Sequence, residues 1–207
     1  MIEQPFKDLV ASLAAKSPTP GGGAAAAMSA CLGAALLVMV IRFSRGKKAT
    51  LEHDEPLAQA EEQLLTLLSR LEPMAERDCA SFDAVSMAYK LPKESEAEQG
   101  VRNQAIEQGM LGAMVVPEET LAIIHDVLET MVPVLGFVGR NIGSDLGSGT
   151  EMLVAGAEAA FFNVRINAAY LKDRAKAESA LQHNESVLSE VRDVHSSVRT
   201  AVEKMMS

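Results

Sequence analysis

Two carboxylates, Asp78 and Asp145, have the clearest capacity for acid–base chemistry in this 207-residue sequence. Partial burial moves the pKa of a carboxyl group towards neutrality, where the group can donate a proton and take it back. Each also has a simpler structural interpretation. Asp78, four residues before Phe82, fits a solvated helix residue, and Asp145, next to Ser144, fits the start of a helix, where negative charge is favoured. The sequence leaves both interpretations open.

A pair of amides, Asn163 and Asn167, is spaced by four residues in a largely apolar stretch. This spacing places both side chains on one face of a helix, and the apolar surroundings predict that the helix is buried. Buried amides need partners, because an unbonded polar group is costly away from water. They therefore bond either to neighbouring helices or to a heteroaromatic ligand, since an amide both donates and accepts hydrogen bonds.

A glycine turn precedes the most apolar part of the chain. Pro20, Gly21, Gly22 and Gly23 lead into residues 24–41, which carry no charge. Backbone N–H groups of such a turn, together with the positive end of the following helix, form a seat for an anion. No Gly-Lys-Ser/Thr follows, so the turn is not a phosphate-binding loop. Close packing of helices explains the glycines equally well.

Four cations, Arg42, Arg45, Lys47 and Lys48, follow the apolar run. Positive charge is favoured at the C-terminal end of a helix, which makes a structural role the simpler interpretation. The functional alternative is a clamp for an anionic group. With a net charge of -9, the chain needs a local basic patch to bind an anion, and a general nucleic-acid partner is disfavoured.

Other reactive side chains do not form recognisable sites. The four histidines are scattered outside metal-binding spacings, and no Gly-x-Ser-x-Gly is present, so we predict neither a metal nor a serine hydrolase. Cys31 and Cys79 lie far apart, as is typical of free thiols in a reducing compartment. The first residues lack the apolar core of an export signal.

Helices are predicted to position all these groups, because helical spacing recurs along the chain and strand alternation is absent. We expect a buried helix rather than a membrane span at residues 24–44, and a Gly-rich turn at 138–149. The fold class is an all-α, single-domain bundle over residues 1–207, built on a long central helix of small residues. Two further helical regions are expected at 4–16 and at 54–90, the second broken at Pro73. The Ser95–Glu98 capping box opens another helical region, which Pro117 and Pro133 divide. The last two expected helices are 150–172 and one with a coiled-coil-like apolar seam from 177 to 205.

Several motifs in order resemble the formiminotransferase-cyclodeaminase family, in particular its cyclodeaminase domain and the related methenyltetrahydrofolate cyclohydrolases. The most specific is PTPGGG at 18–23, followed by an alanine-rich helix and an R-x-S-x-G-K-K end. Weaker matches complete the order up to about residue 175: DCASFDAV around Asp78, Leu91-Pro92-Lys93, Arg102, Ser144-Asp145-Leu146, and Asn163-Val-Arg-Ile-Asn167 followed by Asp173.

The resemblance implies a cytoplasmic, all-helical homodimer that acts on a reduced folate, with or without a polyglutamate tail, and needs no metal or cofactor. The first reaction that it implies is formiminotetrahydrofolate cyclodeaminase activity, in which ring closure releases ammonia. The alternative is cyclohydrolase activity, in which water opens the 5,10-methenyl bridge. The resemblance and the residue chemistry together favour Asp78 over Asp145 as the acid. They also give a substrate-binding set: Pro20, Gly21, Gly22, Gly23, Arg42, Arg45, Lys48, Lys93, Ser144, Asn163 and Asn167.

The sequence departs from the family pattern at two places. Ala24 stands where PTPGGG is usually followed by serine, and Val138-Gly139 stands where a Gly-Asn pair is usual. These departures motivate a non-enzymatic alternative, a folate-binding or scaffold dimer that has lost catalysis. Binding of folate without turnover would favour that alternative.

Overall fold

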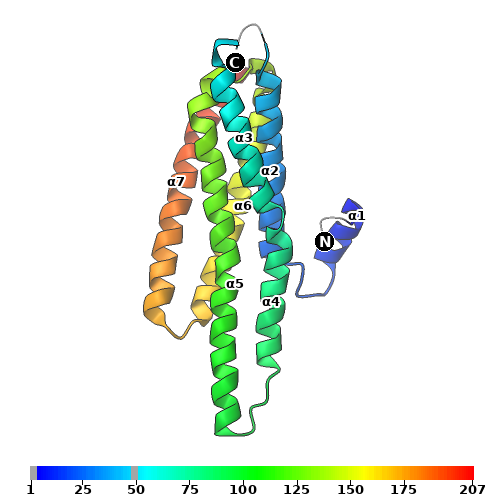
Figure 1. Ribbon diagram of the computed structural model, residues 1–207, viewed down its shortest axis with the longest axis vertical. Coiled ribbons are helices and arrows are strands. Elements are labelled where there is room, and N and C mark those ends of the chain that lie inside the picture. Colours follow the sequence, from blue (N-terminus) through cyan, green and yellow to red (C-terminus); the bar gives the residue numbers. More distant parts are fainter. Residues whose placement is uncertain (1–3, 48–50) are drawn as a thin grey trace.

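The computed structural model describes residues 4–47 and 51–207, and in these residues every regular element is a helix (Figure 1). Seven α-helices and three short 3-10 helices follow one another, which confirms the all-α class. In chain order they are α1 (Phe6–Ala14), α2 (Gly22–Ser44), η1 (Leu51–His53), α3 (Asp54–Leu71), α4 (Met74–Tyr89), α5 (Glu96–Met131), η2 (Val132–Phe137), η3 (Arg140–Ile142), α6 (Gly143–Tyr170) and α7 (Arg174–Met206).

The central pair is formed by α2 and α6, which run antiparallel at unusually close range. A Cβ atom built on Gly33 would lie 2.6 Å from the backbone oxygen of Gly149, and one built on Gly156 would lie 2.9 Å from that of Ala26. Both separations are too short for a real side chain, so glycine is required at the contact. The small residues of α2 therefore accept a close neighbour, as predicted, but the neighbour is α6 of the same chain.

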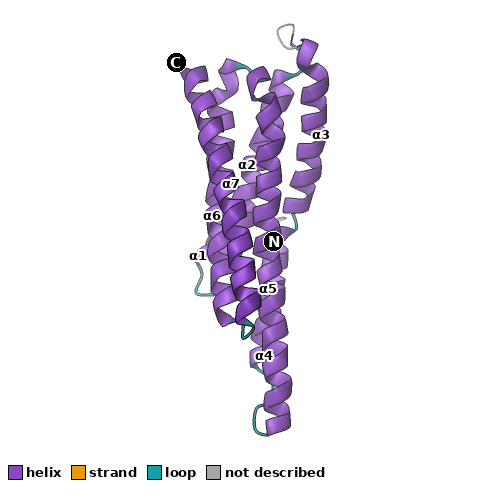
Figure 2. Cartoon of the chain, turned by 90° about the vertical axis from the view of Figure 1, so that its left-hand side faces the viewer, coloured by secondary structure: helices purple, strands orange, loops and turns teal. Residues whose placement is uncertain are grey.

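The remaining helices enclose this pair along its length (Figures 1 and 2). α3 and α4 follow one another along one side, α5 crosses the face, and α7 lies against α6. One cluster of buried aliphatic side chains connects them, with fully buried members such as Leu37, Leu64, Ile124 and Leu153. The end of α4 and the first turns of α5 extend below the other helices as a hairpin, while α1 stands apart from the bundle.

Most expected boundaries agree with the structure. The helix break at Pro73 separates α3 from α4, Gly46 has a φ of 66° just after α2, and Ser95 and Glu98 form the reciprocal capping box of α5. Most of the predicted seam of α7 is also buried, from Ala177 to Val202. The local signals at these positions agree with the tertiary packing.

Two expectations were wrong. Pro117 does not divide the chain, because α5 continues through it as one 36-residue helix. Pro117 and its neighbours Val116 and Leu121 are buried, so packing outweighs the lost hydrogen bond. The Gly-rich stretch 138–149 is not one turn either: α6 begins at Gly143, and Gly149 is a packing residue against Leu36 and Leu37 of α2.

Two stretches, Gly22–Ser44 and Glu96–Phe137, are long and apolar enough to cross a membrane by length and composition. The core helix of a bundle has the same properties. α2 fits that description, because Ala24, Leu37 and Ile41 are fully buried against the rest of the protein. The expectation that no membrane is involved stays a prediction.

Candidate active site

A cavity of about 360 Å³ lies where the start of α2 meets α4, α5 and the second half of α6. Several of the residues singled out from the sequence line this cavity. Gly21, Gly22 and Gly23 form one edge, Asp78 of α4 lies beside them, and Asn163 and Asn167 of α6 also line the cavity. Pro20 belongs to the same turn but is not among the lining residues.

Asp78 is seated directly against the first turn of α2. A Cβ atom on Gly23 would lie 2.0 Å from Oδ1 of Asp78, so only glycine leaves room for this carboxylate. The adjacent Gly22 is different, because its Cβ would meet Nδ2 of Asn163 at 3.6 Å, an ordinary contact. Gly23, the third glycine of the turn, is therefore the one that leaves space for the carboxylate of Asp78.

Burial raises the pKa of Asp78 above its ordinary value, and the backbone N–H of Ala24 opposes the shift by favouring the ionised form. The positive end of the α2 dipole acts in the same direction as that N–H. No lysine or arginine pairs with Asp78 anywhere in residues 4–47 or 51–207. The simple interpretation of Asp78 as a solvated helix residue was therefore wrong.

The two amides are oriented by hydrogen bonds from their nitrogen atoms. Nδ2 of Asn163 donates to the backbone oxygen of Ala159 at 2.8 Å, and Nδ2 of Asn167 donates to that of Ala113 on α5 at 3.0 Å. Within the described part of the chain, no donor reaches either amide oxygen. Two oriented acceptors therefore remain available in the cavity for N–H groups of a ligand.

Apolar and aromatic side chains complete the cavity, and sequence analysis missed all of them except Phe82, the ring expected to keep water from Asp78. Ile166 and Tyr170 come from α6, Phe82 and Val85 from α4, and Met110 from α5. Helical spacing contained a signal for four of them. Ile166 and Tyr170 lie three and seven residues after Asn163, and Phe82 and Val85 lie four and seven after Asp78, so each group shares one helix face.

The predicted cations lie at the opposite end of α2. Arg42 lies twenty residues after Gly22 on the same helix, which corresponds to about 30 Å. Nε of Arg42 and Nη1 of Arg45 both donate to the carboxylate of Glu61, each at 2.6 Å. Arg45 also lies 3.5 Å from Asp54. Within one protomer these arginines are helix-end ion pairs far from the cavity.

Three other predicted residues are also away from Asp78. Ser144 and Asp145 belong to the first turn of α6, eighteen or more residues and about 27 Å from Asn163. Lys93 lies in the connection between α4 and α5, with an exposed side chain and a backbone oxygen that accepts from Gln99. Lys48 lies outside the described residues. The structure brings Asp78, not Asp145, to the amides and the glycine turn.

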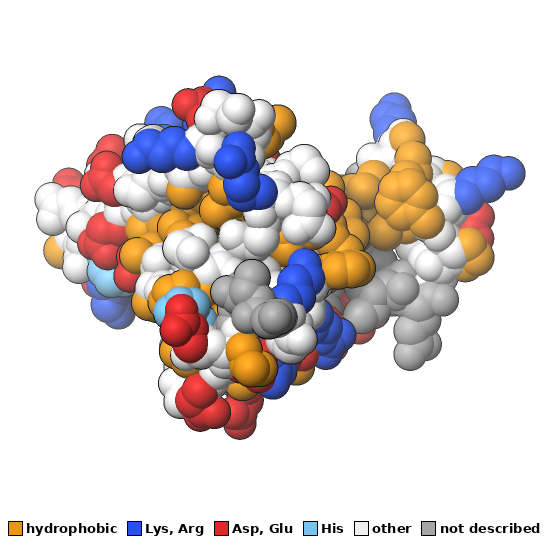
Figure 3. Space-filling model, turned by 90° about the horizontal axis from the view of Figure 1, so that it is seen from above, with side chains coloured by type: hydrophobic (Ala, Val, Ile, Leu, Met, Phe, Trp, Pro, Cys, Tyr) orange, Lys and Arg blue, Asp and Glu red, His pale blue; other side chains and the backbone are white. Residues whose placement is uncertain are grey.

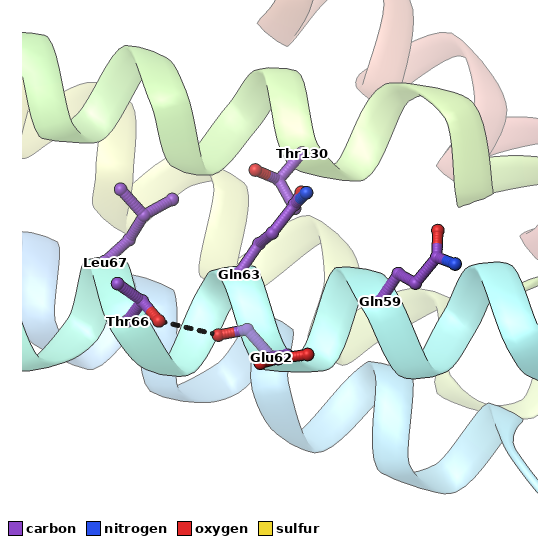
Figure 4. A pocket seen from close by; sticks show the side chains of 6 residues that line it. All are labelled: Gln59, Glu62, Gln63, Thr66, Leu67 and Thr130. Carbon is purple, nitrogen blue, oxygen red and sulfur yellow. Dashed lines mark hydrogen bonds between the residues drawn. The ribbon is translucent and has the colours of Figure 1, made fainter.

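A hollow of about 520 Å³ between α3 and α5 offers less chemistry, and Figure 4 shows its side chains. Amide and hydroxyl groups dominate it, and the hydroxyl of Thr66 donates to the backbone oxygen of Glu62 on the same helix. Its lining residues are Gln59, Glu62, Gln63, Thr66, Leu67 and Thr130. In the described residues, no three His, Cys, Asp or Glu side chains come together in a way that could hold a metal ion.

Known proteins resemble this chain over most of its length. It is 38% identical over 178 residues to the methenyltetrahydrofolate cyclohydrolase of Methylorubrum extorquens, a match that covers 86% of each chain. It is 32% identical to the formimidoyltransferase-cyclodeaminase of Gallus gallus across 99% of this chain but 38% of the larger protein. The crystal structure of the formiminotetrahydrofolate cyclodeaminase of Thermotoga maritima has the same fold, with a TM-score of 0.89 over the whole chain at 22% identity.

The family assignment rests on a match that extends far beyond the glycine turn. The model of the formiminotransferase-cyclodeaminase family matches residues 5–186, a range that includes every helix from α1 to α6 and the cavity between them. The chain belongs to the formiminotransferase-cyclodeaminase family.

Proposed function

We propose that the cavity beside Asp78 binds a reduced folate and that the protein hydrolyses the 5,10-methenyl bridge, as a methenyltetrahydrofolate cyclohydrolase. The observation that carries this proposal is an unpaired, half-buried carboxylate beside two oriented amide oxygens. Sequence analysis placed the cyclodeaminase reaction first and the cyclohydrolase reaction second. We now place the cyclohydrolase reaction first, because the 38% identical cyclohydrolase matches over most of both chains.

The cavity suits a flat heteroaromatic ring. The amide oxygens of Asn163 and Asn167 accept hydrogen bonds from ring N–H groups, and the side chains of Val85, Met110 and Ile166 supply apolar walls. The exposed ring of Tyr170 provides a surface for stacking. In this arrangement the bridging carbon of the substrate comes near Asp78.

Asp78 provides the proton transfer that the hydrolysis needs. Water adds to the carbon between the two nitrogens of the methenyl bridge and gives a proton to the Asp78 carboxylate, forming a tetrahedral carbon. The acid then returns this proton to the departing nitrogen as its bond to carbon breaks. The hydroxyl on that carbon loses its own proton to water, which leaves a formyl group on the other nitrogen, so that the cationic methenyl bridge and one water give the formyl product and one released proton. A well-placed carboxyl group contributes roughly 10²–10⁴-fold to such a step.

Cyclodeaminase activity is the second candidate, because the 32% identical match with the chicken enzyme extends over nearly the whole of this chain. The same geometry serves it. An N–H nitrogen of the folate attacks the carbon of the protonated formimino group and gives its proton to Asp78, and Asp78 passes that proton to the amino group, which leaves as ammonia. A homodimer, a cytoplasmic setting and the absence of any cofactor complete the proposal.

The test presents 5,10-methenyltetrahydrofolate and 5-formiminotetrahydrofolate to the protein separately, and follows methenyl absorbance and ammonia. We expect the methenyl absorbance to fall in the first reaction. Appearance of methenyl absorbance together with ammonia in the second would assign the cyclodeaminase reaction instead. Binding of both compounds with neither turned over would identify a protein that has lost catalysis.

A further inference from the structure

The hairpin formed by the end of α4 and the first turns of α5 continues the candidate active site beyond its cavity (Figures 1 and 2). Phe82 and Val85 line the cavity from α4, and Tyr89 lies one turn further along the same helix face. On α5, Arg102 lies eleven residues before the lining residue Ala113, which is about three turns along one face. The two helix faces that enclose the cavity therefore lead on to Tyr89 and Arg102.

The guanidinium group of Arg102 is held in place by Tyr89. Cζ of Arg102 lies 5.4 Å from the centre of the Tyr89 ring, and Nε donates to the backbone oxygen of Tyr89 at 3.3 Å. Arg102 is half-buried, while Tyr89 is exposed. An arginine that is already fixed over an aromatic ring loses little further side-chain freedom when it binds another group.

Arg102 has no carboxylate partner among residues 4–47 and 51–207. Two acidic side chains that neighbour it along α5 are engaged elsewhere. Glu98 accepts a hydrogen bond from the backbone N–H of Ser95 in the capping box, and Glu107 accepts one from that of Lys172. In the same part of the chain, no acceptor reaches the Nη groups of Arg102. A cation that is oriented but unpaired is suited to binding an anion.

The arginines at the other end of the bundle differ from Arg102 in this respect. Figure 3 looks onto that end, where the side chains of lysine and arginine lie among those of aspartate and glutamate. Arg42 and Arg45 both donate to the carboxylate of Glu61 there. Their charge is therefore offset within the chain, whereas the charge of Arg102 is not.

The end of α6 directs an extended ligand towards the hairpin. Tyr170 is the last residue of α6 that lines the cavity, and two residues later the backbone N–H donates to Glu107 of α5. In the opposite direction α6 touches α2, because a Cβ atom on Gly156 would lie 2.9 Å from the backbone oxygen of Ala26. A ligand bound between the amides and Asp78 can therefore extend towards Arg102 but not between α2 and α6.

The distance from Asp78 to this arginine suits a reduced folate, and this step rests on the proposed function. Tyr89 lies eleven residues after Asp78, or about 16 Å along α4. Beyond the bridging carbon, the folate has a benzoyl ring, an amide and a glutamate, which span roughly 10 Å by ordinary bond lengths. A hydrogen bond at each end adds about 3 Å. The extended substrate therefore reaches from Asp78 to the guanidinium group held by Tyr89.

We propose that Arg102 binds a carboxylate of the first glutamate of the folate, and that Tyr89 holds Arg102 in position for this contact. The Nη groups of a guanidinium lie side by side in one plane and match the two oxygens of a carboxylate. The benzoyl ring then lies beside Phe82 and Tyr89. Further glutamates, where present, extend beyond Arg102. Since the first glutamate is common to all chain lengths, this contact serves the monoglutamylated substrate as well.

A purely structural role for Arg102 is the alternative that the test must separate. Tyr89 is the last residue of α4, and a cation is favoured at the C-terminal end of a helix. In that role Arg102 ties α5 to α4 without touching the substrate. A loosened hairpin would then weaken binding of compounds with and without a glutamate equally.

The test compares 5,10-methenyltetrahydrofolate with 5,10-methenyltetrahydropteroate, which lacks the glutamate. In Arg102→Gln we expect KM for the first compound to rise about 10-fold, because hydrogen bonds to a charged group are lost, and KM for the second to stay at the wild-type value. Arg102→Lys keeps the charge without the planar fork, so its KM should fall between the two. Direct titration with tetrahydrofolate and tetrahydropteroate gives the same comparison without turnover.

Lys90→Gln is the matched control. It removes an exposed charge from the same hairpin, about 100° around α4 from Tyr89, and we expect it to leave both KM values unchanged. A rise as large as that in Arg102→Gln would mean that the overall charge of the hairpin, rather than the Arg102 contact, attracts the substrate, and would overturn the inference. Circular dichroism should report the same helix content in all the variants.

Two further outcomes overturn the inference. An equal rise for both compounds in Arg102→Gln would assign Arg102 to the hairpin alone, and unchanged values for both would place the glutamate elsewhere. Wild-type protein that binds tetrahydrofolate more tightly than tetrahydropteroate, loses this preference in Arg102→Gln and turns over neither folate substrate would support the contact and contradict the proposed catalysis alone. Wild-type protein that binds neither compound would contradict both.

Discussion

The two ends of the α2–α6 pair use their polar groups in different ways. At the end where α2 finishes, Arg42 and Arg45 share the carboxylate of Glu61, although Nε of Arg45 is buried without a hydrogen-bond partner among the described residues. At the end where α2 begins, Asp78 has no cationic partner among the described residues, and the oxygens of two asparagines accept nothing. Ion pairs formed between two helices of one chain are explained by the fold. Groups left open around a cavity need a ligand to explain them.

The variant with the largest expected effect, Asp78→Asn, tests whether the reaction takes place at the end where α2 begins. Asp78→Asn keeps the shape of the side chain and removes the proton that it transfers. We expect kcat to fall by roughly 10²-fold or more, with folate binding nearly intact. Steady-state kinetics and a direct binding titration measure the two quantities separately.

Asp145→Asn is the matched control at the other end. It removes a carboxylate from the first turn of α6, about 27 Å from Asn163, so within one protomer it should leave kcat close to the wild-type value. Loss of activity in Asp145→Asn with none in Asp78→Asn would reverse the assignment of the acid.

A second variant sharpens the claim that the glycine turn makes room for the acid. Gly23→Ala adds a Cβ atom 2.0 Å from Oδ1 of Asp78, which forces the carboxylate or the start of α2 to move. Overpacking of this kind costs about 1–3 kcal/mol in the free energy of unfolding, and we expect kcat to fall with it. Denaturant unfolding and steady-state kinetics measure these two effects.

Gly22→Ala, one residue earlier, is the control for this crowding, because its Cβ meets its nearest neighbour at 3.6 Å. It should cost far less in both unfolding and turnover. Equal losses in the two variants would mean that the turn needs flexibility rather than space for Asp78.

The contrast between the ends was only partly predictable from the sequence. Helix periodicity, the Pro73 break and the Ser95–Glu98 capping box are local signals, and they predicted the helices correctly. The predicted break at Pro117 was wrong, because the helix hydrogen bond that this proline loses is outweighed by burial of the surrounding side chains among residues distant in sequence. The glycines of 143–149 misled because a glycine needed for contact with α2 looks the same in sequence as one needed for a turn.

The candidate site was predictable in its members but not in its grouping. Asp78, Gly23 and Asn163 were each singled out, and their helices bring them to one cavity. Arg42, Ser144 and Asp145 were placed in the same list, because the order of motifs along a chain does not tell which end of a helix each one occupies. Only the antiparallel packing of α2 and α6 separates the two groups.

Neutralising the basic end should have a smaller effect. Arg42→Gln, or Arg45→Gln, tests the prediction that these cations bind the glutamate tail. Since they lie about 30 Å from the cavity of their own protomer, they reach a tail only if a second copy brings its basic end to that cavity. We expect KM for a polyglutamylated substrate to rise by about 2- to 5-fold, in line with a partly exposed ion pair, and KM for the monoglutamylated substrate to change less.

Glu61→Gln serves as the control for the basic end, because it removes the internal partner and leaves both cations in place. It should not raise the KM for the polyglutamylated substrate. An equal rise for both substrates in the arginine variants would assign Arg42 and Arg45 to helix-end ion pairs alone.

The smallest expected effect is on the thermal stability of the fold, and it concerns Asp78 at the end where α2 begins. Burial raises the pKa of Asp78 in the folded protein, so folding favours the protonated acid. The stability that this preference contributes is complete below the unfolded pKa of about 3.9 and is lost as pH rises through the higher folded value. Above that folded pKa the protein holds an ionised carboxylate in a partly desolvated place. Asp78→Asn removes that cost, and we expect its Tm to exceed that of the wild type near pH 7, with the difference shrinking as pH falls towards 4. Thermal unfolding of both proteins across this pH range measures the difference. A lower Tm for Asp78→Asn at pH 7 would mean that the interaction of the carboxylate with Ala24 and the α2 dipole outweighs its desolvation. The acid would then stabilise the fold as well as serving the reaction.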